Sequence, residues 1–363
     1  MLARLTAVKS EQYLTWFSIF GWSEMAETET FRNRALAIIA IVLVIASLRA
    51  SYAVTMPLAA AFVIIAAVWP LKPWLDRVLP SKISYLVTIL FLLLISVGFI
   101  AAVYFSVAQV VRAFTQNQQL FEGYASLTSW TERWGMQDLV GREWYARLIS
   151  FGQSLLTDAY TVFVYLGFIA ILVILGLPEV PAFRNKLRGA LNAADRLEVI
   201  DTVDEIAGKV RQYLGITALC SVMTGIASTL LAYAVGLELA LVWGVLNFLL
   251  NFIPVIGNIV GILPPTLYAI IQFQDLTMPL IVFSGFALLQ IVISNFVNPA
   301  LQGRSLALSP FAIIVALAFW SWVWGIAGAL IAVPLTAALV TVCEHFRSTE
   351  WVARLLSTPQ KSK

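Results

Sequence analysis

Uncharged amide side chains gather in the C-terminal third of this chain, inside sequence that is otherwise apolar. On a helix, Gln290, Ser294 and Asn298 would share one face, at i, i+4 and i+8. Inside a membrane, such groups either hydrogen-bond neighbouring helices or line a path for a polar solute. The sequence leaves both interpretations open. The candidate residues of a substrate path are Asn247, Asn251, Asn258, Gln290, Ser294, Asn295, Asn298 and Gln302.

Prolines and glycines interrupt the two long apolar runs on either side of this stripe. In "NFIPVIGNIVGILPP" the break is expected at Pro254 and Gly257, and in the second run at "WGIAG". A broken helix frees backbone amides and carbonyls, which a membrane tolerates only where they are buried in protein or line a cavity. We therefore predict two broken-helix hairpins, at about 239–272 and 307–343, in the manner of inverted repeats. The expected turn and hinge residues are Pro254, Gly257, Gly261, Pro264, Pro265, Gly325, Gly328 and Pro334.

Composition places the hairpins in an all-α, polytopic membrane protein. The 363 residues are 60% hydrophobic and 12% charged, and the mean hydropathy is +0.87, far from the balance of soluble domains. The net charge of +3 is small, so no nucleic-acid surface is indicated. Cys220 and Cys343 lie in or beside apolar segments, and we interpret them as small buried hydrophobic residues.

Basic residues in the connecting segments predict which side each end of a span faces. Arg and Lys on the flanks of the first two spans, after the fourth span and in the tail favour the cytoplasm, so both termini are expected inside. Parity then requires the run at about 239–272 to begin and end outside, and the run at 307–343 to begin and end inside. Each run is either a re-entrant hairpin, which we favour, or two complete spans. The remaining spans are expected at about 35–49, 52–69, 84–110, 158–178, 213–236 and 278–299.

The chain therefore divides into segments of different character. The segment after the fourth span has apolar residues at helical spacing, which predicts an amphipathic helix along the membrane or against a neighbour. The segments are a cytoplasmic or interfacial N-terminal part (1–34), three spans (35–110), an extracytoplasmic helical subdomain (111–157), a fourth span (158–178), the cytoplasmic amphipathic helix (179–212), a transport core (213–343) and a cytoplasmic tail (344–363).

Catalytic and metal chemistry find no support in the motifs of the sequence. Gly208-Lys209 lacks the remainder of a phosphate-binding loop, and His345 is the single histidine, whereas a zinc protease needs a pair. No Gly-x-Ser-x-Gly elbow is present. We expect no enzyme, no catalytic residue, no metal site and no cofactor, so that any transport is driven by a gradient or runs downhill.

Three stretches together resemble one family of bacterial membrane proteins. "NFIPVIGNIVGILPP", "SNFVNPALQGRSLALSPFAIIVALAFW" and "WGIAGALIAVPLTA" occur in this order and are similar to the C-terminal half of the autoinducer-2 exporter family. That family carries an Ile-Pro-x-x-Gly turn, an Asn-Pro helix end with a Gly-x-Ser-Leu-x-Leu-x-Pro loop, and a final Gly-x-x-Gly and Pro segment. The resemblance is strong over about 205–343, and it adds Pro299 and Gly303 to the candidate hinges.

The resemblance implies a multispan permease of the bacterial inner membrane. Its partners would be the lipid bilayer, a small polar solute, and further copies of the chain in a homo-oligomer, with a pentamer as the candidate form. The solute could be the quorum signal autoinducer-2, because amides suit a neutral polyol. Two alternatives stay open: a sodium or lithium for proton antiporter, which usually needs an intramembrane carboxylate but could hold sodium on backbone carbonyls, and a membrane scaffold that transports nothing.

Overall fold

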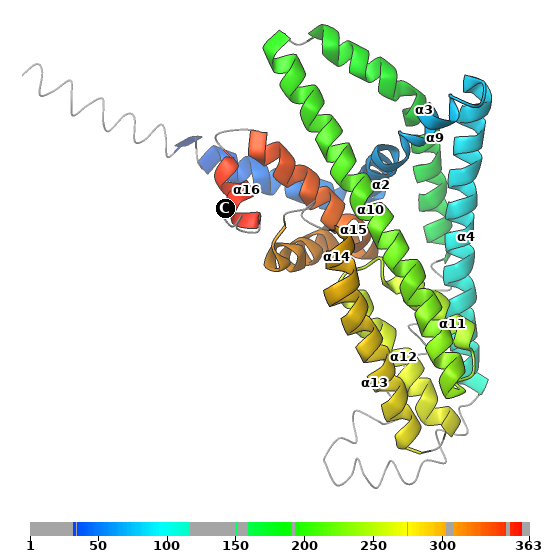
Figure 1. The fold of residues 1–363 in the computed structure, drawn as a ribbon. Coiled ribbons are helices and arrows are strands. Elements are labelled where there is room, and N and C mark those ends of the chain that lie inside the picture. Colours follow the sequence, from blue (N-terminus) through cyan, green and yellow to red (C-terminus); the bar gives the residue numbers. More distant parts are fainter. Residues whose placement is uncertain are drawn as a thin grey trace, which may run out of the picture. The chain divides into compact units, whose positions relative to one another are not determined.

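The protein is described here by a computed structural model that covers residues 32–33, 35–116, 150, 159–190, 193–273, 275–302, 308–345 and 349–357. These residues are helical almost throughout, and the drawing shows mostly long helices (Figure 1). Seven described helices are long and apolar enough to cross a membrane. The prediction of an all-α polytopic membrane protein is confirmed. The candidate spans are Tyr52–Leu75, Ser81–Ala113, Val164–Leu187, Val199–Val235, Ile256–Phe273, Thr277–Gln302 and Pro310–His345.

The chain divides into two units, one ending at Thr55 and the other beginning at Met56. In the first unit, an apolar helix runs over Ala35–Ala50 and is too short to count among the candidate spans. Its hydrogen bonds continue past Ser51, whose N–H donates to Ser47 O at 2.9 Å. That the first two runs cross the membrane twice stays a prediction, as do the interfacial helix and the extracytoplasmic subdomain, which lie outside the described residues.

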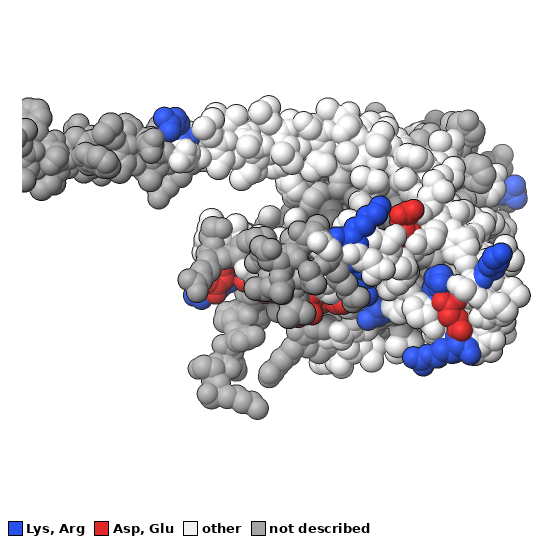
Figure 2. Space-filling view, turned by 90° about the horizontal axis from the view of Figure 1, so that it is seen from above, with Lys and Arg blue, Asp and Glu red and all other residues white. Residues whose placement is uncertain are grey.

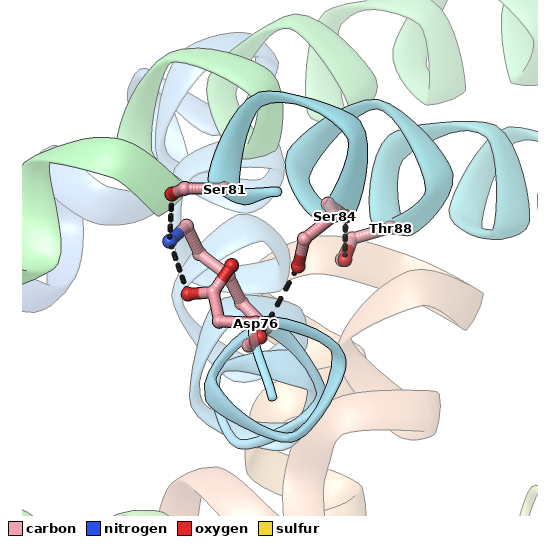
Figure 3. Close-up of polar contacts among 5 residues, drawn as sticks. Asp76, Ser81, Ser84 and Thr88 are labelled. Atoms are coloured by element: carbon pink, nitrogen blue, oxygen red, sulfur yellow. Dashed lines mark hydrogen bonds and ion pairs between the residues drawn. The ribbon is translucent and has the colours of Figure 1, made fainter. Parts of the chain in front are cut away.

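In the second unit, a polar turn connects the next helices. Helix α2 spans Tyr52–Val68, α3 spans Leu71–Leu75 and α4 spans Ser81–Gln116. At the turn between α3 and α4, Lys72 Nζ donates to Asp76 Oδ2 at 2.9 Å and to Ser81 Oγ at 3.3 Å, while Ser84 Oγ donates to Lys72 O at 3.2 Å (Figure 3). Side-chain hydrogen bonds therefore add to the backbone hydrogen bonds of this turn.

The expected amphipathic helix at 179–212 is instead shared between two long helices. Helix α9 spans Ala159–Ala190 and α10 spans Ala193–Val235, so each extends from a candidate span into this segment. Arg184 forms an ion pair with Asp204 and thereby links the two extensions. Helix α9 continues from its candidate span into this segment through Pro178 and Pro181.

Helices α10 and α11 approach each other through glycines. Helix α11 spans Ala240–Leu250. A methyl group at Gly244 would lie 1.8 Å from Thr229 Oγ1 and 2.6 Å from Gly225 O, and one at Gly225 would lie 2.9 Å from Phe248 Cβ. Small residues allow such close approach between membrane helices. Helix α12 follows over Ile256–Phe273 after an interruption at 251–255.

The helix that carries most of the amide stripe is regular only in its first part. Helix α13 spans Thr277–Val292, the π-helical turn η1 spans Ile293–Val297, and α14 spans Asn298–Gln302. Pro299 has no N–H to donate to Asn295 O, the ordinary partner four residues back, and a π turn directly before a proline accommodates that loss. The i, i+4, i+8 spacing expected of a plain helix therefore does not hold across this segment.

The last long helix, α15, is interrupted near its middle. It spans Pro310–His345 and leaves helical geometry at Trp324 (φ −129°, ψ 18°) and Gly325 (φ 64°, ψ −146°). Trp320 Nε1 donates to Thr336 Oγ1 at 3.0 Å although sixteen residues separate them, which in a straight helix would correspond to about 24 Å. A short helix, α16 (Glu350–Leu356), packs against α15.

One face of the molecule carries both charged and uncharged areas (Figure 2). Seen from above the view of Figure 1, Lys, Arg, Asp and Glu side chains lie close together over part of the surface, next to wide uncharged areas (Figure 2). Many large apolar side chains are exposed on α2, α4, α9 and α10. A chain with this distribution needs an apolar solvent for those helices.

Candidate functional site

A carbonyl that lost its helical partner anchors the centre of the candidate site. Pro265 has no N–H, so the carbonyl of Gly261, four residues earlier in α12, receives no helical hydrogen bond. Asn247 of α11 supplies the missing donor, since its Nδ2 lies 3.2 Å from Gly261 O and 3.0 Å from Trp243 O. The Asn247 side chain is fully buried. Pro265 and Asn247, the first of the candidate path residues, are therefore linked through the carbonyl of Gly261.

These contacts fix the orientation of the next amide. Carbonyl oxygens only accept, so Asn247 must turn its nitrogen to Gly261 and Trp243 and its oxygen to α13. There, Gln290 Nε2 donates to Asn247 Oδ1 at 2.8 Å. The remaining atom, Gln290 Oε1, is buried and accepts no hydrogen bond from the described residues. Gln290 is 4% exposed, so an uncompensated acceptor lies where α11, α12 and α13 meet.

Gly261 makes this junction possible by having no side chain. A methyl group on it would lie 2.3 Å from Asn247 Oδ1 and 3.3 Å from Gln290 Nε2. Both distances are shorter than ordinary van der Waals contacts. The absence of a side chain at Gly261 therefore leaves room for the Asn247–Gln290 hydrogen bond.

Two further candidate path residues, Asn251 and Asn258, also connect helices by hydrogen bonds. Asn251 Nδ2, just past the end of α11, donates to Ser221 Oγ of α10 at 3.0 Å. Asn258 Nδ2 of α12 donates to Ser294 Oγ in η1 at 2.6 Å. These bonds are what the interpretation as interhelical hydrogen bonding expects, and Ser221 is a partner that the sequence reading did not single out.

The rest of the stripe is divided by the π turn. Asn295 and Pro299 are exposed, so the structure does not bring them to the buried junction. Asn298 is half-buried, and its Oδ1 is a second buried acceptor without a hydrogen-bond donor among the described residues. Gln302 is half-buried at the end of α14, and Gly303 lies outside the described residues.

The interruption between α11 and α12 is tight and strained. A methyl group on Gly257 would lie 1.8 Å from Leu250 O, so no larger residue fits beside the end of α11. Val255 has φ +64°, the left-handed region that costs a β-branched residue about 1–2 kcal/mol. Strained backbone of this kind concentrates at functional positions. Half-buried Pro254 precedes Val255, and buried Gly257 follows.

The interruption in α15 uses glycine in two ways. Gly325 has φ +64° and open space around it, so it supplies a conformation that L residues avoid. Gly328 supplies room, since a methyl group there would lie 2.0 Å from Trp320 O. Trp320 stacks on Trp324 with ring centroids 4.9 Å apart. Pro334 is buried on the return arm.

Comparison with known proteins shows the family of the chain. The sequence pattern of a family described as "AI-2E family transporter" matches this chain over residues 36–348. The chain belongs to this family. The resemblance seen in the C-terminal motifs is thereby confirmed, and it extends over the N-terminal spans as well.

Relatives of this AI-2E family transporter cover it to different extents. A "Putative transport protein" of Borreliella burgdorferi is 35% identical over 55% of this chain, and "AI-2 transport protein TqsA" of Escherichia coli is 30% identical over 57%. The chain covers 53% and 60% of these two relatives. A "Putative transport protein" of Haemophilus influenzae is 26% identical over 90% of this chain and 97% of its own length.

The first arm of each broken segment in this transporter is short. Helix α11 has 11 residues and is about 16 Å long, and the part of α15 before Gly325 is about 21 Å long. The hydrocarbon core of a bilayer is about 30 Å thick. Neither first arm crosses that thickness alone, whereas α12, with 18 residues, is about 27 Å long.

Polar groups outside the stripe hold the two ends of the transporter core. Near the start of α11, Tyr268 OH donates to Glu238 Oε2 at 2.7 Å, and Gln272 Nε2 donates to Gly236 O at 2.7 Å. On α10, Lys209 Nζ lies 2.8 Å from Glu205 Oε1 and 3.5 Å from Glu344 Oε2. These pairings could not be predicted from the sequence, because their members are 30 or more residues apart, except Glu205 and Lys209.

Among the described residues, no group of three or more His, Cys, Asp and Glu side chains could hold a metal ion. At the junction of α11, α12 and α13, the polar groups described above are amides, hydroxyls and backbone carbonyls. Such groups bind by hydrogen bonding and by weak coordination, without a change of protonation near neutral pH.

Proposed function

We propose that this AI-2E family transporter is a permease for a small, neutral, hydroxylated solute. The path passes the junction of α11, α12 and α13. The observation that carries the proposal is the acceptor Gln290 Oε1, which is buried and receives no hydrogen bond from the described residues. An unpaired buried acceptor costs about 1–3 kcal/mol, so a position that keeps one is a candidate contact for a ligand.

The direction of the hydrogen bonds supports a hydroxyl donor. The side-chain nitrogens of Asn247, Asn251, Asn258 and Gln290 all donate to partners within the protein. The oxygens Gln290 Oε1 and Asn298 Oδ1 are left as acceptors. A solute with several O–H groups satisfies such oxygens, whereas a carboxylate or phosphate would place negative charge against them.

Autoinducer-2 is the first solute to test. The relative "AI-2 transport protein TqsA" is named for its transport, and a polyol of that kind offers the required donors. We further propose that both broken segments are re-entrant hairpins, because their first arms are shorter than the hydrocarbon core. Movement of the hairpins about Val255 and Gly325 would expose the junction to either side in turn.

The test is uptake of labelled autoinducer-2 by the purified protein in sealed liposomes, with and without imposed sodium and proton gradients. Uptake of the neutral solute is expected. Gln290→Met keeps the length of the side chain but removes its amide, and should lower the uptake rate about tenfold, the loss of one hydrogen bond of about 1.4 kcal/mol. Gln272→Met is the matched control, because its amide is paired outside the junction, and it should leave uptake within about twofold.

Three results would count against this function. Equal loss of uptake in both variants would show that Gln290 acts only through stability. Dissipation of a sodium gradient without solute flux would favour the antiporter. No flux of any kind, with protein inserted and folded, would favour the scaffold interpretation.

Orientation in the inner membrane is tested separately by thiol accessibility. In a background with Cys220→Ala and Cys343→Ala, Asn258→Cys near the tip of the first hairpin should react with an impermeant reagent from the outside alone. Reaction from the inside alone would reverse the expected topology, in which both termini are cytoplasmic.

A further inference from the structure

Helix α16 presents two different faces. Ala353 is 2% exposed and packs in one apolar cluster with Val333, Ala337 and Val340 of α15. On the other side, Trp351 is 62% and Leu355 71% exposed. These two residues are four apart and share one face of the helix. The exposed Arg354 lies beside them.

The buried side of α16 closes the base of the α15 hairpin. Ser309, directly before α15, donates its N–H to Leu356 O at 2.9 Å, and Leu308 pairs with Ser357 in a backbone bridge. Near the C-terminal end of α15, Thr349 Oγ1 donates to Cys343 O at 3.2 Å. One short segment is therefore bonded to both ends of α15.

The position of α16 along the chain limits its distance from the bilayer. The candidate span that precedes it ends at His345, and α16 begins at Glu350. Four intervening residues can span at most about 18 Å, and the hydrogen bond from Thr349 to Cys343 places the start of α16 beside the end of α15. The helix consequently lies within reach of the lipid head groups.

We propose that α16 docks on the anionic lipid surface and thereby holds the hairpin base closed. Trp351 and Leu355 insert at the boundary between head groups and acyl chains, where tryptophan and leucine are favoured. Arg354 binds lipid phosphate; one of its nitrogens lies 2.6 Å from Glu350 Oε1, and the planar guanidinium has further donors.

The test is spin labelling of the full chain in nanodiscs of phosphatidylcholine, alone or mixed with phosphatidylglycerol. With Cys220→Ala and Cys343→Ala in place, a label at Leu355→Cys should collide with oxygen more often than with a water-soluble nickel chelate, and the preference should rise with phosphatidylglycerol. A label at Asp275→Cys, in the exposed turn before α13, should prefer the nickel chelate in both lipids.

Hydrogen exchange of the Ser309 amide reports, independently of transport, whether its hydrogen bond to Leu356 O is kept. The double variant Trp351→Ser and Leu355→Ser should speed exchange of this amide about tenfold, by loss of apolar burial in the lipid, and should remove its dependence on phosphatidylglycerol. Ala353→Glu, which disrupts the protein face, should speed exchange in either lipid.

Two results would overturn the proposal. A Leu355 label that favours the nickel chelate would place this face in water. Strong coupling between labels of neighbouring copies would assign the face to an interface between chains.

Discussion

Replacing Gly261 with alanine offers a measurement of the α11–α12–α13 junction. The added methyl group would lie 2.3 Å from Asn247 Oδ1, and the amide cannot turn away without breaking its bonds to Gly261 O and Gln290 Nε2. Each buried group left unpaired costs about 1–3 kcal/mol, or about 2–6 kcal/mol for the two. Alanine gains about 1 kcal/mol over glycine in a helix. The net expected loss in the free energy of unfolding is about 1–5 kcal/mol.

The same substitution should change sign when Asn247 is already alanine. In that background both groups have lost their partner and the clash is gone, so only the gain in helix propensity remains, about 1 kcal/mol. Gly215→Ala calibrates this gain, because no atom lies within 4 Å of its added methyl group. The assay is reversible unfolding in mixed micelles for the wild type, both single variants and the double variant. An equal cost of Gly261→Ala in both backgrounds would refute the role given to the Asn247 amide.

Three other predictions concern the turns. Gly328→Ala should cost about 1–3 kcal/mol of unfolding free energy by overpacking against a backbone carbonyl, against a small gain for the Gly215→Ala control. Val255→Gly relieves about 1–2 kcal/mol of strain but adds about 0.5–1 kcal/mol of chain entropy, so it should be neutral or stabilising. Val260→Gly, at an exposed position of α12, should instead destabilise the protein by about 0.5–1 kcal/mol. A lower free energy of unfolding in both valine variants would contradict strain at Val255.

The stability contributed by the α3–α4 turn should depend on pH. The hydrogen bond from Lys72 lowers the pKa of the Asp76 carboxyl below its ordinary value of 3.8. A lowered pKa stabilises the folded state above that value and loses the stabilisation as the pH falls through the folded-state pKa. Thermal unfolding should separate wild type from Asp76→Asn at pH 7; the difference should shrink as the pH falls below 3.8 and disappear once the pH is below the lowered folded-state pKa. A difference that persists there would contradict an ionised partner for Lys72.

Hydropathy and charge were enough to predict the class of fold, because each candidate span is long and apolar without reference to its neighbours. The same local reading failed at 179–212. An amphipathic pattern cannot tell a separate helix from the extension of a span, since both present an apolar stripe at the same spacing. The ion pair that joins the two extensions, Arg184 to Asp204, depends on how the helices cross.

The candidate site was predictable in its residue types but not in its pairings. Asn247 and Gln290 were chosen because amides are rare in apolar sequence, and the structure joins them. Asn295 was chosen for helical spacing, and the π turn before Pro299 leaves it exposed. Val255 carried no signal, because positive φ is expected at glycine. Its strain arises from the need to start α12 close to the end of α11.

The two interruptions share one local solution, which supports treating them as related devices. In each, a residue with φ of +64° lies five positions after a carbonyl of the first arm: Val255 after Leu250, and Gly325 after Trp320. A glycine then follows within three residues, and its missing methyl group makes room for that same carbonyl. Valine at the first tip stores strain that glycine at the second does not. The first broken segment, which also contributes Asn258 and Gly261 to the amide contacts, is the one whose interruption would lose strain by changing conformation, and we therefore propose it as the moving part.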